Sequence, residues 1–303
     1  MADFEQTVEL LRALGEPTRC RLLALFRHGE LTVGEIAAVV GQSQPRISRH
    51  LKLLSGVGVL ERFQEEQRVY YRLAASGDEG NLTRYVLDQI AQADPVLDRD
   101  LRHLAPVLKL RVRDAEAKWE DVRRSAESTY ADAQLVRRVL NEVGSETIGN
   151  LLDIGTGSGN MLRILAPRAR QATGMDISAQ ALRLARSNVH GSGLSHCTFK
   201  RGDMYDLPFA AGSFDAVSFD HLLSTAERPI VALREARRVL RRGGRLIVVD
   251  DSRRLSIAAD TEPQSLLQSW LTRVGLQCEK IKPIRGGQSQ LVFALARRGA
   301  APA

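Results

Sequence analysis

The sequence predicts an α/β protein with two domains: a small helical domain that ends in a β-hairpin, and a larger domain built on a doubly wound, mostly parallel sheet. Two short amphipathic segments that meet at Gly41, followed by alternating residues 59–73, indicate the first domain. A short apolar run entering a glycine-rich turn at 155–159, followed by alternating strands and helices, indicates the second. We place the domains at residues 1–80 and 131–303, joined by a helical connector at 81–130.

The composition is that of a globular protein, with 44% hydrophobic and 26% charged residues in a chain of 303. No run approaches the roughly 20 apolar residues that a membrane helix needs, and residues 1–11 are acidic and amphipathic, unlike a signal peptide. We therefore expect a cytoplasmic protein. Cys20, Cys197 and Cys278 lie far apart and predict neither a disulfide nor a zinc site.

Two short helices of the first domain have recognisable ends. Thr32 and the glutamate three residues later have the spacing of a capping box at the start of a helix over 33–40, which Gly41 ends. Ser43 can cap the next helix, whose first turn tolerates Pro45. Two short helices joined by a tight glycine turn predict a helix-turn-helix.

The second of these helices has a basic outer face. Ile47, Leu51 and Leu54 recur at helical spacing and should face the core. Residues 42–54 include no acidic side chain, which would let the helix enter the major groove of DNA. The alternative is a solvated helix face that happens to be basic. The residues of this helix expected to contact DNA are Ser43, Gln44, Arg46, Ser48, Arg49, His50 and Lys52.

A hairpin follows, with strands over 59–63 and 68–73 around a polar tip. It predicts a wing beside the helix-turn-helix. Arg62 and Arg68 are the expected phosphate contacts of this wing, while Glu65 and Glu66 at its tip should weaken such contacts.

Residues 12–73 together resemble the ArsR/SmtB-type winged helix-turn-helix repressors. The resemblance rests on the run Ser43-Gln-Pro-Arg-Ile-Ser-Arg-His-Leu-Lys-Leu-Leu, on Gly58 and on the tyrosine pair at 70 and 71. It implies a homodimer that binds double-stranded operator DNA and represses transcription. Metal-sensing members carry cysteines where this chain has Leu31-Thr-Val-Gly, so we expect no metal.

Apolar residues of the connector recur every three or four positions and form a seam. We expect Pro106 to interrupt its helix. The seam either packs on its own domain or joins the dimer interface. It consists of Leu101, Leu104, Leu108, Val112, Ala115, Trp119 and Val122.

Predicted strands and single helices alternate from residue 150 onward, and an antiparallel hairpin closes the sheet. Ligands of such sheets bind at the carboxyl ends of the strands. The predicted strands are 151–154, 172–176, 197–200, 214–219, 245–249, 276–281 and 290–295, and the predicted helices are 161–165, 179–188, 229–240 and 264–274.

The glycine turn narrows the class of ligand. Its glycines stand at 155, 157 and 159, and Asp176 follows the first of them by about twenty residues. A dinucleotide-binding turn needs glycine in the sixth place, which Asn160 occupies here. Binding of a dinucleotide pyrophosphate is therefore disfavoured.

The run Asp153-x-Gly155-x-Gly157-x-Gly159 resembles that of the class I S-adenosylmethionine-dependent methyltransferases, which have a Rossmann-like fold, and the likeness extends over residues 135–250. It implies S-adenosylmethionine or S-adenosylhomocysteine as cofactor, with Asp153 near the ammonium group, Asp176 on the ribose hydroxyls and residues 202–204 beside adenine. Residues 119–123 also resemble the stretch that precedes related methyltransferase domains. The expected cofactor-binding residues are Asp153, Gly155, Thr156, Gly157, Gly159, Asp176, Ile177, Gly202, Asp203, Met204 and Phe219.

The methyl acceptor is less well marked. Ser218-Phe-Asp-His stands where amino-group DNA methyltransferases have an Asn/Asp-Pro-Pro-Tyr/Phe tetrad, and no cysteine follows a proline, as carbon-5 cytosine enzymes require. DNA and, because the cysteines are scattered, arsenic are therefore disfavoured as methyl acceptors. Residues 252–263 are also short for a lid over the substrate. His221 is a candidate general base, with a solvent-facing or helix-capping role as the alternative.

Two functions follow from these features. The leading hypothesis is a dimeric repressor whose second domain binds S-adenosylmethionine or S-adenosylhomocysteine, so that occupancy changes operator affinity. The alternative is an active methyltransferase of a small metabolite, autoregulated through its winged helix. A third possibility combines both activities, with the substrate of the enzyme acting as inducer.

Overall fold

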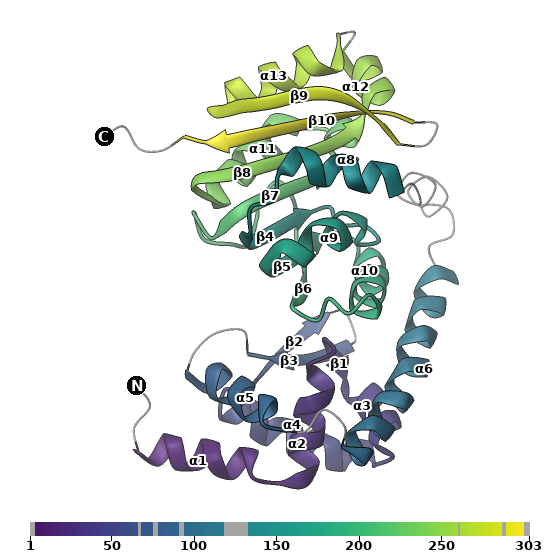
Figure 1. The fold of residues 1–303 in the computed structure, drawn as a ribbon, viewed down its shortest axis with the longest axis vertical. Coiled ribbons are helices and arrows are strands. Elements are labelled where there is room, and N and C mark those ends of the chain that lie inside the picture. The colour runs from purple at the N-terminus through teal and green to yellow at the C-terminus, as the bar shows by residue number, and fades with distance from the viewer. Residues whose placement is uncertain are drawn as a thin grey trace. The chain divides into compact units, whose positions relative to one another are not determined.

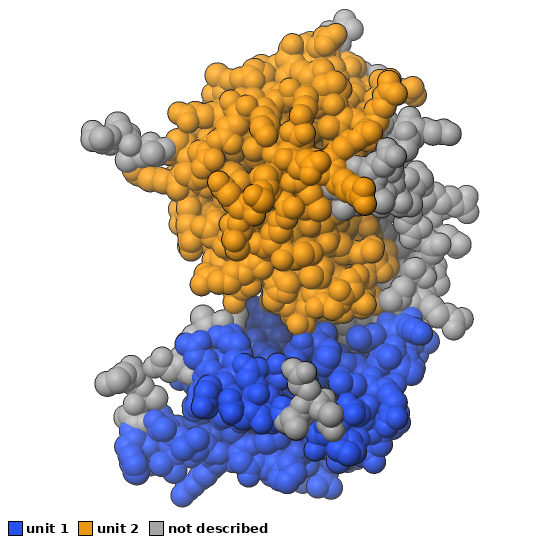
Figure 2. Space-filling model, viewed as in Figure 1, with its two compact units in different colours: residues 1–113 blue, residues 114–303 orange. Residues whose placement is uncertain are grey.

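The computed structural model describes residues 4–65, 68–74, 78–90, 94–117, 133–259, 261–286 and 289–299. The chain forms two compact units, residues 1–113 and 114–303 (Figure 2). The domain limits expected from the sequence, at 80 and 131, stay predictions.

Unit 1 is a bundle of helices with a three-stranded antiparallel sheet of order β1-β3-β2. Its core contains the inner residues of the second helix of the helix-turn-helix, Ile47, Leu51 and Leu54, which are fully buried as predicted. The elements are α1 (Phe4–Leu14), α2 (Pro17–Phe26), β1 (Leu31–Thr32), α3 (Val33–Val40), α4 (Gln44–Gly56), β2 (Leu60–Glu65), β3 (Arg68–Leu73), α5 (Asp78–Asp88) and α6 (Pro95–Ala117).

Both ends of α3 agree with the sequence. The Thr32 amide donates to Glu35 Oε2 at 2.8 Å, and the Glu35 amide donates to Thr32 Oγ1 at 3.3 Å, which completes the capping box. Gly41 ends the helix in the left-handed region with φ of 68°. Ser43 holds the N-cap position of α4, but its side chain makes no capping hydrogen bond, so that part of the prediction is wrong.

The connector seam packs partly on unit 1. Leu104 is buried in the unit 1 core, and Leu101 and Leu108 pack against it. The helix α6 runs through Pro106 without a break, contrary to our expectation. Proline removes one backbone donor from a helix, and the apolar contacts on both sides of Pro106 hold the helix in place despite that loss. Four members of the seam, Val112, Ala115, Trp119 and Val122, have side chains outside the described residues.

A buried ion pair ties α6 to α2. Asp100 is 1% exposed and accepts from Arg21 Nε and Nη2, each at 2.8 Å, and these hydrogen bonds raise the pKa of the guanidinium. The Asp100→Ala substitution should lower the stability of unit 1 by about 2–4 kcal/mol, because it leaves the Arg21 charge half-buried without its partner. Thermal unfolding of the full chain measures this loss. Asp98→Ala on an exposed part of the same helix should shift the unfolding temperature little, and an equal shift for both variants would contradict the prediction.

Unit 2 is a three-layer α/β domain (Figure 1). Its sheet has the order β6-β5-β4-β7-β8-β10-β9. As expected, the first five strands in this order are parallel to one another, and β10 pairs antiparallel with both β8 and β9. Its elements are α8 (Ala133–Val143), β4 (Ile148–Ile154), α9 (Asn160–Leu165), β5 (Ala169–Asp176), α10 (Ala179–Gly191), β6 (Cys197–Arg201), β7 (Phe214–Asp220), α11 (Pro229–Val239), β8 (Leu240–Asp251), α12 (Ser252–Ala259), α13 (Pro263–Arg273), β9 (Leu276–Gly286) and β10 (Ser289–Arg298), with 3₁₀ turns η1 (Ala166–Arg168) and η2 (Leu223–Thr225).

Two apolar cores lie on opposite faces of this sheet. On one face α8, α9 and α10 pack on residues such as Leu151 and Ala216, and on the other α11, α12 and α13 pack on residues such as Leu152 and Val217. Successive strand residues therefore point to opposite cores, which is why the central strands are apolar throughout. The chain adds β5 and β6 on one side of β4, and then adds β7 and β8 on the other side. A doubly wound sheet binds its ligand at the point where the strand order reverses in this way, which lies here between β4 and β7.

Candidate functional sites

A glycine loop joins β4 to α9 at the carboxyl edge of the sheet. Gly155, Gly157 and Gly159 all have positive φ, of 67°, 53° and 84°. A Cβ on Gly155 would come within 2.6 Å of the Leu222 side chain, and one on Gly159 within 2.6 Å of Val189, whereas at Gly157 the nearest atom would be 3.9 Å away. The outer two glycines are therefore required by packing, and the middle one leaves open space beside the loop.

Asp153 lies beneath this loop and is fully buried. Its Oδ1 accepts from the Ser218 hydroxyl at 2.7 Å, whereas Oδ2 and the nearby Thr156 hydroxyl are buried without a hydrogen bond of good geometry. Burial raises the pKa of Asp153 to about 7, against the lowering effect of the Ser218 and Thr156 hydroxyls. A buried carboxylate oxygen without a donor is what a ligand carrying N–H groups would satisfy.

Asp176 ends β5 and touches the same loop. Its Oδ2 accepts from the Gly157 amide at 3.0 Å and its Oδ1 from the Ser178 amide at 2.8 Å. Burial raises the pKa of this carboxylate, and the amide hydrogen bonds oppose the rise. The next residue, Ile177, is 64% exposed, which places an apolar surface beside the carboxylate.

The turn after β6 lies against Asp176 through its backbone, since the Gly202 amide donates to Asp176 O at 3.1 Å. Asp203 is exposed and its Oδ1 accepts from the Tyr205 amide at 2.9 Å. Met204 is half-buried and packs on the core. The Phe219 side chain is fully buried and packs in the apolar core of unit 2.

His221 follows β7 and has an unusual backbone, with φ of 51°, the one positive value outside glycine among the described residues. Its Nδ1 is 2.7 Å from Asp220 Oδ1, and its amide donates to Val249 O at 2.8 Å. Burial lowers the pKa of the imidazole, but the hydrogen bond and charge of Asp220 and the charges of Asp250 and Asp251 outweigh it and leave that pKa raised. Because Leu222 packs on Gly155, this segment borders the glycine loop.

Sequence reasoning missed the two carboxylates that end β8. Asp250 is fully buried, and its Oδ2 and Oδ1 accept from the amides of Ser224 and Asp251 at 3.0 and 2.8 Å. Burial raises the pKa of Asp250. The sequence pattern that could have predicted them is the pair of acidic residues directly after the apolar run Leu246-Ile-Val-Val. Such a pair lies at the edge of the sheet where ligands bind.

The outer face of α4 in unit 1 is the second candidate site. Its expected DNA-contacting residues are exposed, with one exception: His50 is half-buried, with Nδ1 3.7 Å from Glu16 Oε2. Arg62 on β2 and Arg68 on β3 are exposed on the hairpin. The exposed residues of α4 and its N-cap are Ser43, Gln44, Arg46, Ser48, Arg49 and Lys52.

Candidate metal ligands do not cluster among the described residues of either unit. In the part of the chain that the structure describes, no group of three or more His, Cys, Asp or Glu side chains could hold a metal ion. Within the same part, none of the helices has the length and apolar character needed to cross a membrane.

Known proteins resemble this chain in both units. Curated relatives include the ubiquinone/menaquinone biosynthesis C-methyltransferase UbiE of Desulfotalea psychrophila, 33% identical over 45% of this chain and 55% of that protein, and the demethylmenaquinone methyltransferase of Porphyromonas gingivalis, 34% identical over 35% and 45%. The chain thus spans about half the length of these relatives.

A solved complex between a Haloferax volcanii methyltransferase activator and a methyltransferase contains a chain with the fold of unit 2. The TM-score is 0.52 at 19% identity, over 63% of this chain and 99% of that one. Residues 16–62 match the family described as bacterial regulatory protein, arsR family, and residues 152–248 match the family described as methyltransferase domain. The protein therefore joins an arsR-family helix-turn-helix domain to a methyltransferase domain with a Rossmann-like fold.

Proposed function

We propose that the protein is an operator-binding transcriptional repressor whose methyltransferase domain binds S-adenosylmethionine or S-adenosylhomocysteine, so that occupancy changes its affinity for DNA. The observation that carries the proposal is the site around the glycine loop, where the buried Asp153 Oδ2 makes no hydrogen bond of good geometry. This site belongs to the same chain as an exposed basic helix of the arsR family. The protein acts as a homodimer on double-stranded DNA in the cytoplasm.

Each part of the cofactor has a matching group in this site. Asp153 would accept from the ammonium group, and the open side of Gly157 would admit the amino acid backbone. Asp176 retains a lone pair on each oxygen for the ribose hydroxyls, while its amide contacts hold it in place. The exposed Ile177 would lie against adenine, with Asp203 and the backbone of Gly202 and Met204 at its edge.

Operator binding tests the regulatory part. Fluorescence anisotropy with operator DNA at fixed salt should give a different dissociation constant when either compound is added at saturation, and Asp176→Ala should abolish that difference while leaving DNA affinity in the absence of ligand unchanged. If both compounds bind and operator affinity stays the same, the sensing function is wrong.

The outer face of α4 has its own test. Arg49→Ala should weaken DNA binding on every sequence tested and reduce the slope of log K against log salt by about 1, because it removes a phosphate contact. Arg84→Ala is the matched control, since Arg84 is exposed on α5, outside the helix-turn-helix and the hairpin. An Arg49→Ala slope equal to that of the wild type would remove Arg49 from the interface.

Methyl transfer is the second candidate function, favoured by the pair formed by Asp220 and His221. Asp220 orients the imidazole through Nδ1, so that Nε2 can take the proton of an acceptor while the bound cofactor supplies the methyl group. The names of the relatives suggest a ring of the quinone class as acceptor. Conversion of S-adenosylmethionine to S-adenosylhomocysteine in the presence of a reduced naphthoquinone would support this function, provided that His221→Asn abolishes it.

A further inference from the structure

Carboxylates occupy the ends of four neighbouring parallel strands in unit 2. In sheet order β5-β4-β7-β8, these are Asp176, Asp153, Asp220, and the pair Asp250 and Asp251. The buried Asp153 is near enough to Asp220 and Asp176 for both charges to raise its pKa, and Asp220, Asp250 and Asp251 all raise the pKa of His221. The five carboxylates and the imidazole therefore form one electrostatic group, which we call the acidic edge.

Little positive charge offsets the acidic edge. Within the described residues, no Lys or Arg forms an ion pair with Asp153, Asp176, Asp250 or Asp251, and Asp220 pairs with His221. The nearest basic residues in sequence are Arg253 and Arg254, both exposed on the first turn of α12, and Arg254 reaches Asp251 through its backbone amide alone. A cationic ligand would compensate this negative charge.

A second observation shows that the acidic edge is built for a ligand. Asp153 is fully buried and its Oδ2 makes no hydrogen bond of good geometry, although it lies between Asp220 and Asp176. An uncompensated buried carboxylate costs several kcal/mol unless a donor or a positive charge approaches it. The segment of His221 and Leu222 is packed directly on the glycine loop, which places the His221 end of the edge next to the same site.

From this arrangement we infer that the acidic edge recognises the sulfonium charge: it favours S-adenosylmethionine over S-adenosylhomocysteine, and His221 makes this preference depend on pH. The inference rests on the proposed cofactor function. The two compounds have the same amino acid, ribose and adenine groups, and they differ in the methyl group and the positive charge on sulfur. The ratio of their affinities therefore reports the electrostatic potential that the protein creates at the sulfur atom.

The direction of the pH effect follows from the charges. At low pH the imidazolium of His221 offsets part of the carboxylate charge, and at higher pH the neutral imidazole no longer does, so the preference for the sulfonium grows. Asp153, with a pKa of about 7, and Asp176, whose pKa burial also raises, are assigned to the ammonium and ribose groups that both compounds share, so their effects largely cancel in the ratio. Burial raises the pKa of Asp250 as well, and the hydrogen bonds from the Ser224 and Asp251 amides oppose that rise. We expect the loss of one nearby positive charge to change the ratio about five-fold, which corresponds to about 1 kcal/mol.

Calorimetric titration of the full-length protein tests the inference with S-adenosylmethionine and S-adenosylhomocysteine at about pH 6 and pH 8, which bracket the titration of a histidine. The ratio of the dissociation constant of S-adenosylhomocysteine to that of S-adenosylmethionine should rise about five-fold in the wild type. It should stay constant in His221→Asn, a side chain that tolerates positive φ. Asp251→Asn should lower the ratio at both pH values.

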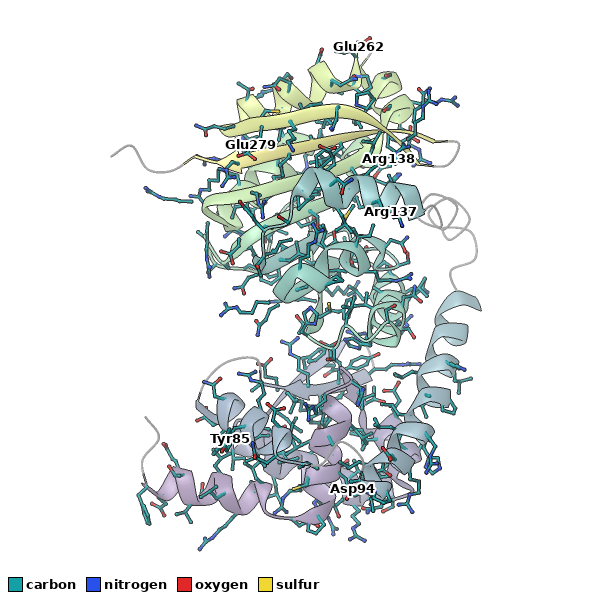
Figure 3. All side chains as sticks on the ribbon, in the orientation of Figure 1. Tyr85, Asp94, Arg137, Arg138, Glu262 and Glu279 are labelled. Atoms are coloured by element: carbon teal, nitrogen blue, oxygen red, sulfur yellow. The ribbon has the colours of Figure 1, made fainter. Side chains whose placement is uncertain are left out.

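Glu279→Gln is the matched control, because it removes the same charge from β9, where Glu279 (Figure 3) pairs with Arg297. Arg297 lies beside Arg245 on β8, at the opposite end of the pairing of β10 with β8 from Asp251. Its ratio should follow that of the wild type. Binding of both compounds with a ratio independent of pH in the wild type would overturn the inference and leave the proposed cofactor site standing. An equal pH dependence in His221→Asn would also overturn it, and failure of both compounds to bind would reject the site itself.

Discussion

Replacement of Asp176 by alanine should weaken binding of S-adenosylmethionine and S-adenosylhomocysteine by roughly 100-fold. The proposed site loses two hydrogen bonds to the ribose hydroxyls, and a hydrogen bond to a charged group contributes about 1.5 kcal/mol or more. The substitution also releases the Gly157 and Ser178 amides that the carboxylate holds, so the glycine loop loses an anchor. Calorimetric titration of the purified full-length protein measures both affinities.

Two further variants separate these contributions. Asp176→Asn keeps an oxygen that can accept from one of the two amides but removes the charge, and should therefore bind with intermediate affinity. Asp206→Ala removes an exposed carboxylate from the loop after β6, which we assign no ligand contact, and should bind like the wild type. Binding by Asp176→Ala within about three-fold of the wild type would remove Asp176 from the cofactor site.

Replacement of Asp153 by asparagine should make the ligand-free protein more stable and abolish cofactor binding. The folded-state pKa of Asp153, about 7, lies above its ordinary value of 3.8, so the folded chain binds the proton more tightly than the unfolded chain. The stabilising contribution of the protonated carboxyl is complete below the unfolded pKa and is lost as the pH rises toward 7. One pKa unit corresponds to about 1.4 kcal/mol, so the loss at pH 8 is about 2–4 kcal/mol.

Hydrogen exchange of the β4 and β7 amides measures this effect in the full-length chain, because it reports on unit 2 directly. The stability gain of Asp153→Asn should be largest near pH 8 and small near pH 4, where the wild-type carboxyl is also neutral. Saturating S-adenosylmethionine should protect the wild type and leave Asp153→Asn unaffected. A gain that is the same at both pH values would show that the charge of Asp153 is not its cause.

Local patterns predicted most of both units. The capping box at Thr32 and the buried stripe of Ile47, Leu51 and Leu54 depend on residues near in sequence, and the parallel sheet was predicted from the alternation of short strands with single helices. Each is decided by spacing and periodicity, which the sequence shows directly.

Features that depend on distant contacts were not predicted. The carboxylates Asp250 and Asp251 reach His221 only because β8 pairs with β7 in a register that aligns Asp220 with Val249. Continuity of α6 through Pro106 depends on the packing of that helix on unit 1, and local propensity alone predicts a break. His50 has the spacing of an outer-face residue, but Glu16 at the start of α2 lies beside it.

Contact between Leu222 and the position of a Gly155 side chain links two parts of unit 2 that are distant in sequence. Any residue larger than glycine at 155 would collide with Leu222, and any change of size at 222 alters the room above the loop. Because Gly155 also has a φ of 67°, which disfavours every other residue whatever the space, position 155 should stay glycine while position 222 can vary. The size of the side chain at 222 therefore sets the room beside the loop, next to His221.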